Sequence, residues 1–105
     1  MKIVGIAACT SGIAHTYIAR EKIMKAAGEL GYEIHMETQG TIGTEDELTA
    51  EQIKEADFVL LVIDIKIGGR DRFKGKKVVE VSTNTAIKAP KKLLEAVVEK
   101  VQSAQ

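Results

Sequence analysis

The sequence predicts an α/β fold in which helices cover both faces of a mainly parallel sheet. Apolar, β-branched runs of strand length alternate along the chain with segments whose apolar residues recur at helical spacing. One of these runs, FVLLVI at residues 58–63, is apolar at every position, which is typical of a central parallel strand. Strands that alternate with helices require right-handed crossovers, and these place helices on both faces of the sheet.

The chain begins with a predicted strand and helix. An apolar run at residues 3–6 indicates the strand, and a helical pattern extends from about residue 15 to residue 30. Gly31 is expected to end this helix, because glycine readily adopts the left-handed conformation common at helix C-termini. The apolar stripe of the helix consists of Ala19, Ile23, Ala26 and Leu30.

A second strand is expected at residues 33–38, followed by a loop at residues 39–43. A short helix is expected next. Thr49 and Gln52 have the spacing of a capping box, in which each side chain bonds the backbone of the other residue. We therefore expect this helix to extend from about residue 49 to residue 56.

The second half of the chain is expected to contain two strands, at residues 58–63 and 77–81, and a final helix. Pro90 suits the first turn of that helix, where its missing N–H group would have no partner. The apolar stripe of the final helix consists of Leu94, Val97, Val98 and Val101. The predicted order of elements is β-α-β-α-β-β-α.

Length and composition limit the possible classes of protein. The 105 residues suffice for one hydrophobic core, so residues 1–105 are expected to form a single domain. Fifteen basic and fifteen acidic residues give zero formal net charge, which does not favour nucleic acid or an anionic membrane as partner. The longest apolar run is too short to span a bilayer, and the N-terminus lacks a signal-peptide pattern. A single cysteine excludes an internal disulfide and suits the reducing cytoplasm.

That single cysteine, Cys9, lies on the predicted turn between the first strand and the first helix. The first N–H groups of a helix have no partners within it, so they can hold an anion such as phosphate. The same field favours a thiolate, which is the nucleophilic form of cysteine. The residues alone allow two interpretations, a packed core cysteine and a nucleophile that accepts phosphate. Thr10, Ser11 and Gly12 suit a phosphate-binding loop better than a core, and so favour the nucleophile.

The loop resembles that of the cytoplasmic IIB components of the fructose-type phosphoenolpyruvate-dependent sugar phosphotransferase system. The family carries Cys-Pro-Thr-Gly-Ile-Ala-His-Thr-Tyr-Met-Ala, and residues 9–19 of this chain read CTSGIAHTYIA. The chain departs from the family at Thr10, Ser11 and Ile18. These departures bear on the closest subfamily, and so on the sugar, but not on the phosphoryl chemistry. Further matches are Glu37-Thr38-Gln39-Gly40, Gly43, Leu48-Thr49, Ala56-Asp57, Asp64 and Arg72-Phe73.

The resemblance implies a Rossmann-like, three-layer α/β/α fold with a four-stranded sheet in the order 2-1-3-4. It also implies a phosphotransferase that takes phosphate from a phosphohistidine of a IIA partner onto Cys9. The phosphocysteine then donates to a sugar, expected to be fructose, that is bound only by a membrane IIC partner. No cofactor is implied. The residues expected to bind phosphate, mainly through backbone N–H groups, are Thr10, Ser11, Gly12, Ile13, Ala14 and His15.

The partner surface is expected at the carboxyl edge of the parallel strands, where ligands bind in such sheets. Loops at residues 9–15, 39–43 and 64–72 are expected to meet there. The protein is then cytoplasmic, without membrane insertion of its own, and is held at the inner face of the membrane through IIC. The residues expected to contact partners are Gln39, Gly40, Ile42, Arg70 and Arg72.

Two other classes of protein stay open, a cysteine-dependent phosphatase or arsenate-reductase-like enzyme and a non-catalytic anion-binding or regulatory module. His15 follows Cys9 by six residues, the position of arginine in the Cys-x5-Arg loop of tyrosine phosphatases. However, the sequence has no Asp-Pro pair of the kind that supplies the acid in the low-molecular-weight class. His15 either contacts phosphate or only bonds the loop. His35 has no second histidine or cysteine at ligand spacing, so no metal site is expected.

Overall fold

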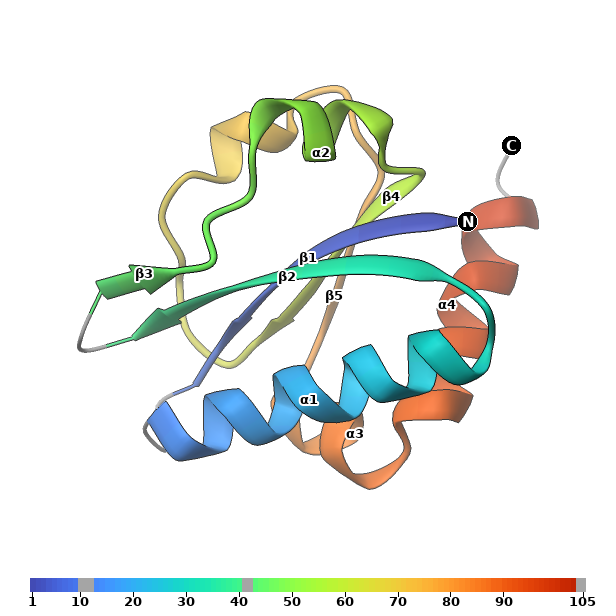
Figure 1. Cartoon of the computed structure of the whole chain (residues 1–105), viewed down its shortest axis with the longest axis horizontal. Helices are drawn as coiled ribbons and strands as arrows, with labels where there is room; N and C mark the ends of the chain where they lie inside the picture. The colour runs from blue at the N-terminus through green and yellow to red at the C-terminus, as the bar shows by residue number, and fades with distance from the viewer. Residues whose placement is uncertain (10–12, 41–42, 104–105) are drawn as a thin grey trace.

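The computed structural model describes residues 1–9, 13–40 and 43–103, and in them one sheet forms the middle layer of the molecule (Figure 1). Within these residues the sheet has five strands in the order β3-β2-β1-β4-β5. Four strands are parallel, and only β3 runs antiparallel, beside β2. The strands are β1 (Lys2–Ala8), β2 (Glu33–Gly40), β3 (Gly43–Glu45), β4 (Phe58–Ile63) and β5 (Val78–Val81).

The predicted order 2-1-3-4 is confirmed for the four parallel strands, because it corresponds to β2-β1-β4-β5. The predicted count of four is one too low. Part of the segment expected to be a loop forms a hairpin instead: Gln39 and Gly40 continue β2, and Gly43 begins β3. A three-residue strand is too short to show an alternating pattern, which explains why the sequence did not predict it.

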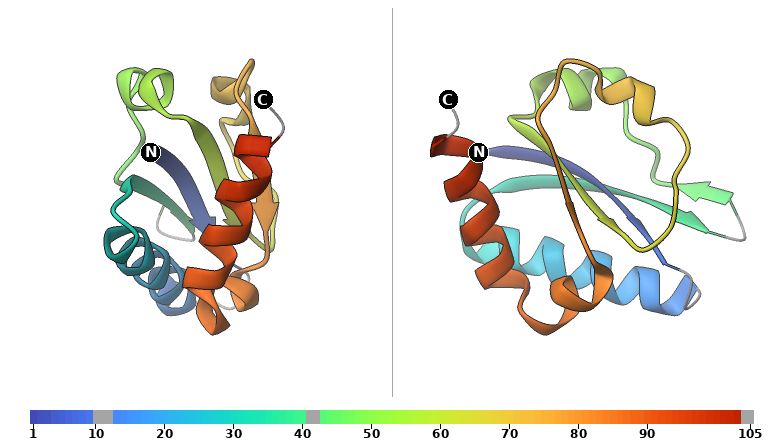
Figure 2. Two further views of the ribbon diagram at one scale, coloured as in Figure 1. Left: turned by 90° about the vertical axis from the view of Figure 1, so that its right-hand side faces the viewer. Right: turned by 180° about the vertical axis from the view of Figure 1, so that it is seen from behind.

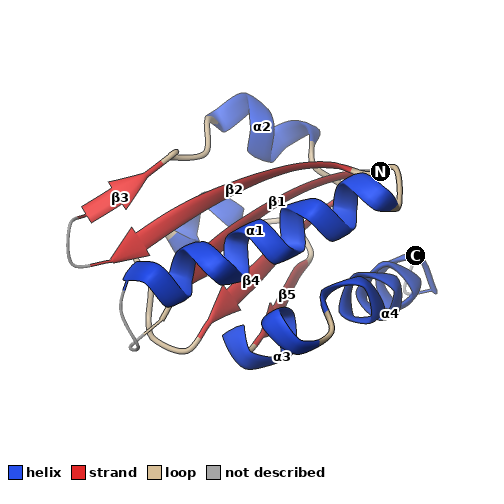
Figure 3. Ribbon diagram, turned by 60° about the horizontal axis from the view of Figure 1, so that its bottom comes forward, coloured by secondary structure: helices blue, strands red, loops and turns tan. Residues whose placement is uncertain are grey.

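Helices cover both faces of the sheet, as predicted (Figures 2 and 3). On one face lie α1 (Ile13–Glu29), α3 (Thr83–Lys88) and α4 (Pro90–Ser103), and on the other lie α2 (Ala50–Glu55) and the 3₁₀-helix η1 (Arg70–Phe73). The sequence did not predict α3 and η1, because six and four residues are too few to show helical periodicity. In the described part of the chain no helix combines the length and the apolar character that crossing a membrane requires.

The strands supply two cores, one on each face of the sheet. In β4, Leu60 and Val62 pack toward α1 and α4, whereas Val59 and Leu61 pack toward α2 and η1. All six residues of β4 are buried, which confirms the interpretation of its continuous apolar run. The four predicted stripe residues of α4 are buried too, and in α1 the stripe is buried except at Leu30, which lies just beyond the helix and is partly buried. The helix stop is also confirmed, since Gly31 has a φ of 79°.

The capping box at the start of α2 is present and supports a prediction. The Thr49 hydroxyl accepts a hydrogen bond from the Gln52 N–H group at 3.1 Å, and the Gln52 side chain accepts one from the Thr49 N–H group at 2.9 Å. Thr49→Ala is expected to lower the free energy of unfolding by about 1 kcal/mol, because the Gln52 N–H group at the helix start loses its partner. Urea unfolding measures the change.

Thr44→Ala is the matched control for Thr49→Ala. Thr44 has the same spacing to Glu47 as Thr49 has to Gln52, but Thr44 lies exposed in β3 and starts no helix. Its replacement is expected to cost clearly less. Equal losses for the two variants would show that the capping bonds contribute no stability of their own.

Candidate functional site

Cys9 lies at the carboxyl end of β1, a strand in the interior of the sheet with β2 and β4 as its neighbours. Figure 1 shows β1 ending beside the first turn of α1, so the predicted turn from strand to helix is confirmed. Ile13 and Ala14 begin α1, and His15 lies in its first turn. Thr10, Ser11 and Gly12, which were expected to bind phosphate, lie outside the described residues.

The Cys9 sulfur faces polar groups from three parts of the chain. Only 7% of Cys9 is exposed. Its Sγ atom lies 3.0 Å from Nδ1 of His15 and donates a hydrogen bond to Oδ2 of Asp64 at 3.3 Å. The Thr83 hydroxyl also points at the sulfur, at 3.6 Å. Three side chains, from the first turn of α1, the end of β4 and the start of α3, therefore meet at one sulfur atom.

Asp64 directly follows β4, and Thr83, which is fully buried, is the first residue of α3. The Thr83 hydroxyl donates a hydrogen bond to Oδ2 of Asp64, and the Thr83 N–H group donates one to Oδ1 at 3.2 Å. The bond from the Thr83 hydroxyl lowers the pKa of Asp64 most; the Thr83 N–H group, Cys9 and His15 lower it further and outweigh the opposing effect of burial. Asp64 is therefore a carboxylate at neutral pH, with both oxygens held in place.

This carboxylate changes the electrostatics expected at Cys9. The sequence predicts that the field at the start of α1 favours a thiolate, but a negative charge 3.3 Å from Sγ acts in the opposite direction. In the structure the thiol is the hydrogen-bond donor to Asp64, so the proton is on the sulfur. The thiolate form of Cys9 stays a prediction, and a reaction that starts from the thiol needs a base to take its proton.

Thr83 is the site residue that sequence reasoning missed. The polar run at residues 82–85 could have indicated a helix start, because Ser82 is the N-cap of α3 and its hydroxyl accepts a hydrogen bond from the Thr85 N–H group. Asp64 was noticed only as part of the family resemblance and as the start of a loop. Neither residue could be assigned to Cys9 from sequence spacing.

A second cluster of charged side chains surrounds Glu37, whose side chain is fully buried in β2. Two nitrogens of Arg72 donate to its two carboxylate oxygens, at 2.8 and 3.0 Å. The Gln39 side chain and the Leu48 N–H group donate to the same carboxylate at 2.9 and 3.0 Å. Burial raises the pKa of Glu37, but the bonds from Arg72, Gln39 and Leu48 outweigh it and hold the pKa below its usual value.

Gln39 and Arg72 therefore have structural contacts that the sequence did not predict. Gln39 also exchanges two hydrogen bonds with the backbone of Gly68, both at 3.0 Å, and so ties the end of β2 to the segment between β4 and η1. Arg70 is exposed and lies 3.8 Å from Glu80. Contact with a partner stays a prediction for Gln39, Gly40, Arg70 and Arg72, and Ile42 lies outside the described residues.

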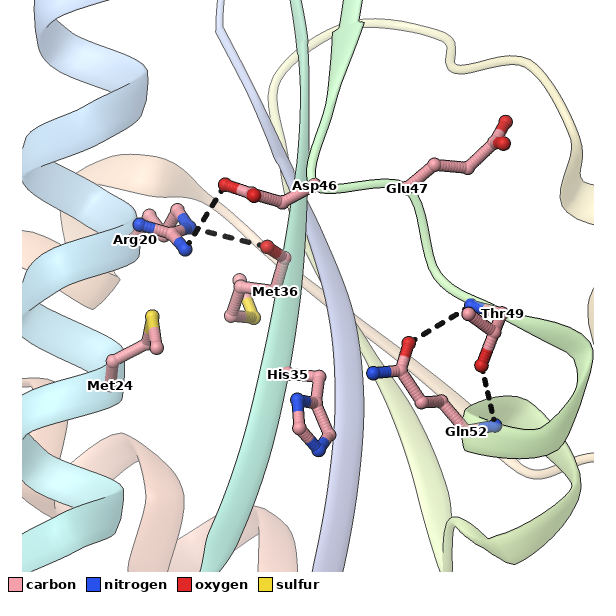
Figure 4. A pocket seen from close by; sticks show the side chains of 8 residues that line it. All are labelled: Arg20, Met24, His35, Met36, Asp46, Glu47, Thr49 and Gln52. Atoms are coloured by element: carbon pink, nitrogen blue, oxygen red, sulfur yellow. Dashed lines mark hydrogen bonds and ion pairs between the residues drawn. The ribbon is translucent and has the colours of Figure 1, made fainter.

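A pocket of about 260 Å³ lies between α1, β2 and the segment that leads to α2 (Figure 4). Arg20 reaches across it from α1, with Nη2 3.3 Å from the Asp46 carboxylate and Nε donating to the Met36 carbonyl at 3.2 Å. His35 lines its wall, whereas Cys9 takes no part in it, so this pocket is separate from the site at the sulfur. Among the described residues, no group of three or more His, Cys, Asp and Glu side chains could hold a metal ion.

Comparison with known proteins gives a consistent result. A family model described as "PTS system, Lactose/Cellobiose specific IIB subunit" matches residues 4–96. The chain is 49% identical over 87 residues to the PTS system fructose-like EIIB component 2 of Escherichia coli K12, covering 83% of this chain and 82% of that protein. It is also 39% identical over 94 residues to the fructose-specific EIIABC component of Bacillus subtilis, covering 90% of this chain but 15% of that longer protein.

Solved structures show the same similarity. The crystal structure of a predicted fructose-specific IIB from Escherichia coli has a TM-score of 0.90 at 36% identity, covering 99% of this chain and 92% of that one. A crystallised domain of a fructose-specific IIABC component from Borrelia burgdorferi has a TM-score of 0.82 at 46% identity, covering 90% and 89% of the two chains.

Proposed function

The chain belongs to the fructose-type IIB components of the sugar phosphotransferase system, and we propose that Cys9 is the residue that carries the phosphoryl group. The role of the chain is phosphotransfer within that system. The observation that supports Cys9 most directly is its position, at the end of an interior strand and before the N-terminus of the 17-residue helix α1. Cys9 is also the only cysteine, so no other thiol competes for the role.

The proposed reaction has two steps. First, the Cys9 sulfur attacks the phosphorus of a phosphohistidine on a IIA partner, so that an S–P bond forms and the P–N bond breaks. Second, a sugar hydroxyl held by a IIC partner attacks the same phosphorus and the S–P bond breaks. The backbone of residues 10–14 and the side chain of His15 are proposed to bind the phosphoryl group, since the free N–H groups of a helix start suit an anion.

The partners are proposed on the names of relatives. The fructose-specific EIIABC component of Bacillus subtilis and the fructose-specific EIIB'BC component of Rhodobacter capsulatus are named for several components in one protein. We infer that this chain works with IIA and IIC components, that it is cytoplasmic, and that IIC holds it at the inner face of the membrane. Fructose is the proposed sugar, because the relatives are named for it, and residues 1–105 are proposed to be one IIB domain.

The partner surface is proposed to surround Cys9. In-line transfer requires the donor nitrogen and the sulfur to lie on opposite sides of one phosphorus atom, so the two proteins must approach closely. Gln39, Gly40 and Ile42 are proposed to contribute from the β2–β3 hairpin, and Arg70 and Arg72 from the segment at η1. The exposed guanidinium of Arg70 would lie on a charged rim, so added salt is expected to weaken the complex.

Intact-mass spectrometry tests the role of Cys9. Wild-type protein incubated with a phosphorylated IIA domain is expected to gain one phosphoryl group, and Cys9→Ser is expected to gain none, because a hydroxyl is a far weaker nucleophile than a thiol. Thr49→Ala, which changes only the start of α2, serves as a control and should accept phosphate like wild type. Phosphorylation of Cys9→Ser to the wild-type extent would exclude Cys9 as the carrier.

An assay with an aryl phosphate and no partner, run beside this experiment, separates the alternatives. A phosphatase would hydrolyse an aryl phosphate without any partner, and a regulatory module would neither hydrolyse it nor accept phosphate. The position of Asp64 favours a carrier over a phosphatase. Its carboxylate contacts the sulfur itself, whereas the acid of a phosphatase must reach the leaving oxygen on the opposite side of the phosphorus.

A further inference from the structure

We propose that Asp64 is a catalytic group in the phosphorylation of Cys9: its Oδ2 atom takes the thiol proton while the S–P bond forms, and it holds that proton as long as the sulfur carries the phosphoryl group. The inference rests on the proposed function, in which Cys9 is the carrier. It adds an acceptor for the thiol proton, which the role of Cys9 as carrier does not specify.

The geometry provides a direct path for the proton. The Cys9 thiol already donates to Oδ2 of Asp64 at 3.3 Å, so transfer needs no intervening group. Thr83 is the positioning residue: it is fully buried, and its hydroxyl and N–H groups each bond one oxygen of the Asp64 carboxylate. Two bonds from one rigid residue leave the carboxylate a single orientation, in which Oδ2 faces the sulfur.

The hydrogen bonds around the sulfur assign different tasks to Asp64 and His15. A thiol has one proton, and here it is donated to Asp64. With a proton on Nδ1, His15 donates to the sulfur at 3.0 Å, and the three groups form one consistent network. His15 can then donate to the sulfur or to a phosphoryl oxygen, and Asp64 remains the group positioned to accept.

The step balances in atoms and charge. A phosphohistidine protonated on its other ring nitrogen loses its phosphoryl group to Cys9 and leaves as neutral imidazole with the electron pair of the P–N bond. The S–H bond breaks, its electron pair forms the S–P bond, and its proton moves to Asp64. The products are a phosphocysteine dianion and a neutral Asp64 carboxyl group. Transfer back to the histidine is the same step in reverse, with Asp64 returning the proton to the sulfur.

Neutralising Asp64 also removes a repulsion. A carboxylate that lies 3.3 Å from Sγ would remain close to a phosphoryl group on that sulfur, and two negative groups at such a distance raise the proton affinity of the carboxyl. Before transfer the Thr83 bonds lower the pKa of Asp64, so the carboxyl is ionised and Oδ2 carries no proton of its own. The phosphoryl group then makes the protonated form the favoured one.

Other charged groups also face Asp64 and contribute to this balance. His15 approaches from α1. Lys66, Arg70 and Glu80 line the same shallow depression as Asp64, and Arg70 is paired with Glu80. The cations favour the carboxylate and Glu80 opposes it, but Lys66, Arg70 and Glu80 take no part in the proposed transfer step. The change in protonation of Asp64 therefore depends on the sulfur.

Asp64→Asn tests the proposal through the pH dependence of the reaction. Phosphorylation of Cys9 by a phosphorylated IIA domain is expected to be about 10²-fold slower at pH 7, because general base catalysis of the attack is lost. The variant lacks this base and can react only through thiolate, so its rate should rise steeply with pH. The wild-type rate should depend on pH much less steeply. A purely structural role would slow the reaction without steepening its pH profile.

Asp57→Asn is the matched control. Asp57 lies directly before β4 and Asp64 directly after it, so the control variant loses the same charge at the opposite end of the same strand. Its carboxylate accepts a hydrogen bond from the Lys2 N–H group at 2.7 Å, which the amide oxygen of asparagine can still accept. Asp57→Asn is expected to keep the wild-type rate and pH profile. Thr83→Val should move both toward those of Asp64→Asn, and Thr83→Ser, which restores the hydroxyl, should recover them.

A measurement on the wild-type protein does not depend on the folding of any variant. In ¹³C NMR of aspartate carboxyl groups, the Asp64 signal is expected to shift to that of a neutral carboxyl at pH 7 when Cys9 is phosphorylated. An Asp64 that stays ionised in phosphorylated protein, or an Asp64→Asn variant with the wild-type pH profile, would overturn the proposal while leaving Cys9 as the carrier. Wild-type protein that never gains phosphate would instead overturn the proposed function.

Discussion

Replacement of Gly5 with alanine is expected to lower the free energy of unfolding by about 3 kcal/mol, because β1 has no room for a side chain at that position. Gly5 lies in the middle of β1, paired with Met36 of β2 and Leu60 of β4. A Cβ atom there would lie 2.4 Å from the Leu60 carbonyl oxygen and 2.6 Å from Sδ of Met36. The Met36 side chain can move, but the Leu60 carbonyl belongs to the backbone of a fully buried strand, so the sheet itself must deform.

Gly28→Ala is the control for Gly5→Ala. Gly28 lies near the end of α1, and a Cβ atom added there would meet nothing within 4 Å. This variant is expected to gain about 0.5–1 kcal/mol, because alanine loses less conformational entropy than glycine when a helix forms. Chemical denaturation of the two variants beside wild type measures both changes. If Gly5→Ala were as stable as wild type, the close approach of β1 and β4 at Gly5 would be contradicted.

The second large effect is expected from Arg72→Met, which leaves the buried Glu37 carboxylate without its cation. Loss of one partner from a buried ion pair typically costs about 3–5 kcal/mol, and we expect about 3 kcal/mol here because Arg72 is partly exposed. Methionine keeps much of the apolar stem of arginine, so the loss reflects the guanidinium. Arg72→Lys should recover only part of the stability, since a single ammonium group cannot bond both carboxylate oxygens as Arg72 does.

Arg70→Met is the control for the loss of a positive charge from the same short helix. Arg70 is half exposed and lies 3.8 Å from Glu80, so its removal is expected to cost at most about 0.5 kcal/mol. Urea unfolding at pH 7 measures all three variants. Equal losses for Arg70→Met and Arg72→Met would contradict the inference that the Arg72–Glu37 pair contributes more stability because Glu37 is buried.

The stability that Glu37 contributes is expected to depend on pH. Its pKa is lowered in the folded state from the value of 4.5 for a free glutamate side chain, so the unfolded chain takes up a proton at higher pH than the folded one does. The contribution is therefore complete above about pH 4.5 and is lost as the pH falls through the lower, folded pKa. In Arg72→Met the strongest bond to the carboxylate is gone, so protonation relieves the buried charge. The difference in stability between wild type and this variant should then shrink in acid.

Much of the fold follows from local patterns. The run at residues 58–63, the apolar stripe of α4 and the capping box of Thr49 with Gln52 each indicate their element within a single segment, and each is confirmed. The elements that sequence reasoning missed, β3, η1 and α3, are 3, 4 and 6 residues long. Elements this short receive their stability from what they pack against rather than from a periodicity of their own.

Local sequence patterns also place Cys9 at the end of a strand and before a helix, with His15 in the first turn of that helix. These two residues are only six positions apart, so the local turn from strand to helix brings them together. Asp64 and Thr83 are different, since they lie 55 and 74 residues after Cys9. Their contact with the sulfur depends on how the strands and helices pack, and spacing along the chain does not indicate it. The sheet places β4 beside β1, which brings the end of β4 to Cys9, and α3 follows β5, the next strand in the sheet. The pair of Glu37 and Arg72 has the same origin, because hydrogen bonds across 35 residues depend on how strands and helices pack, which no local pattern contains.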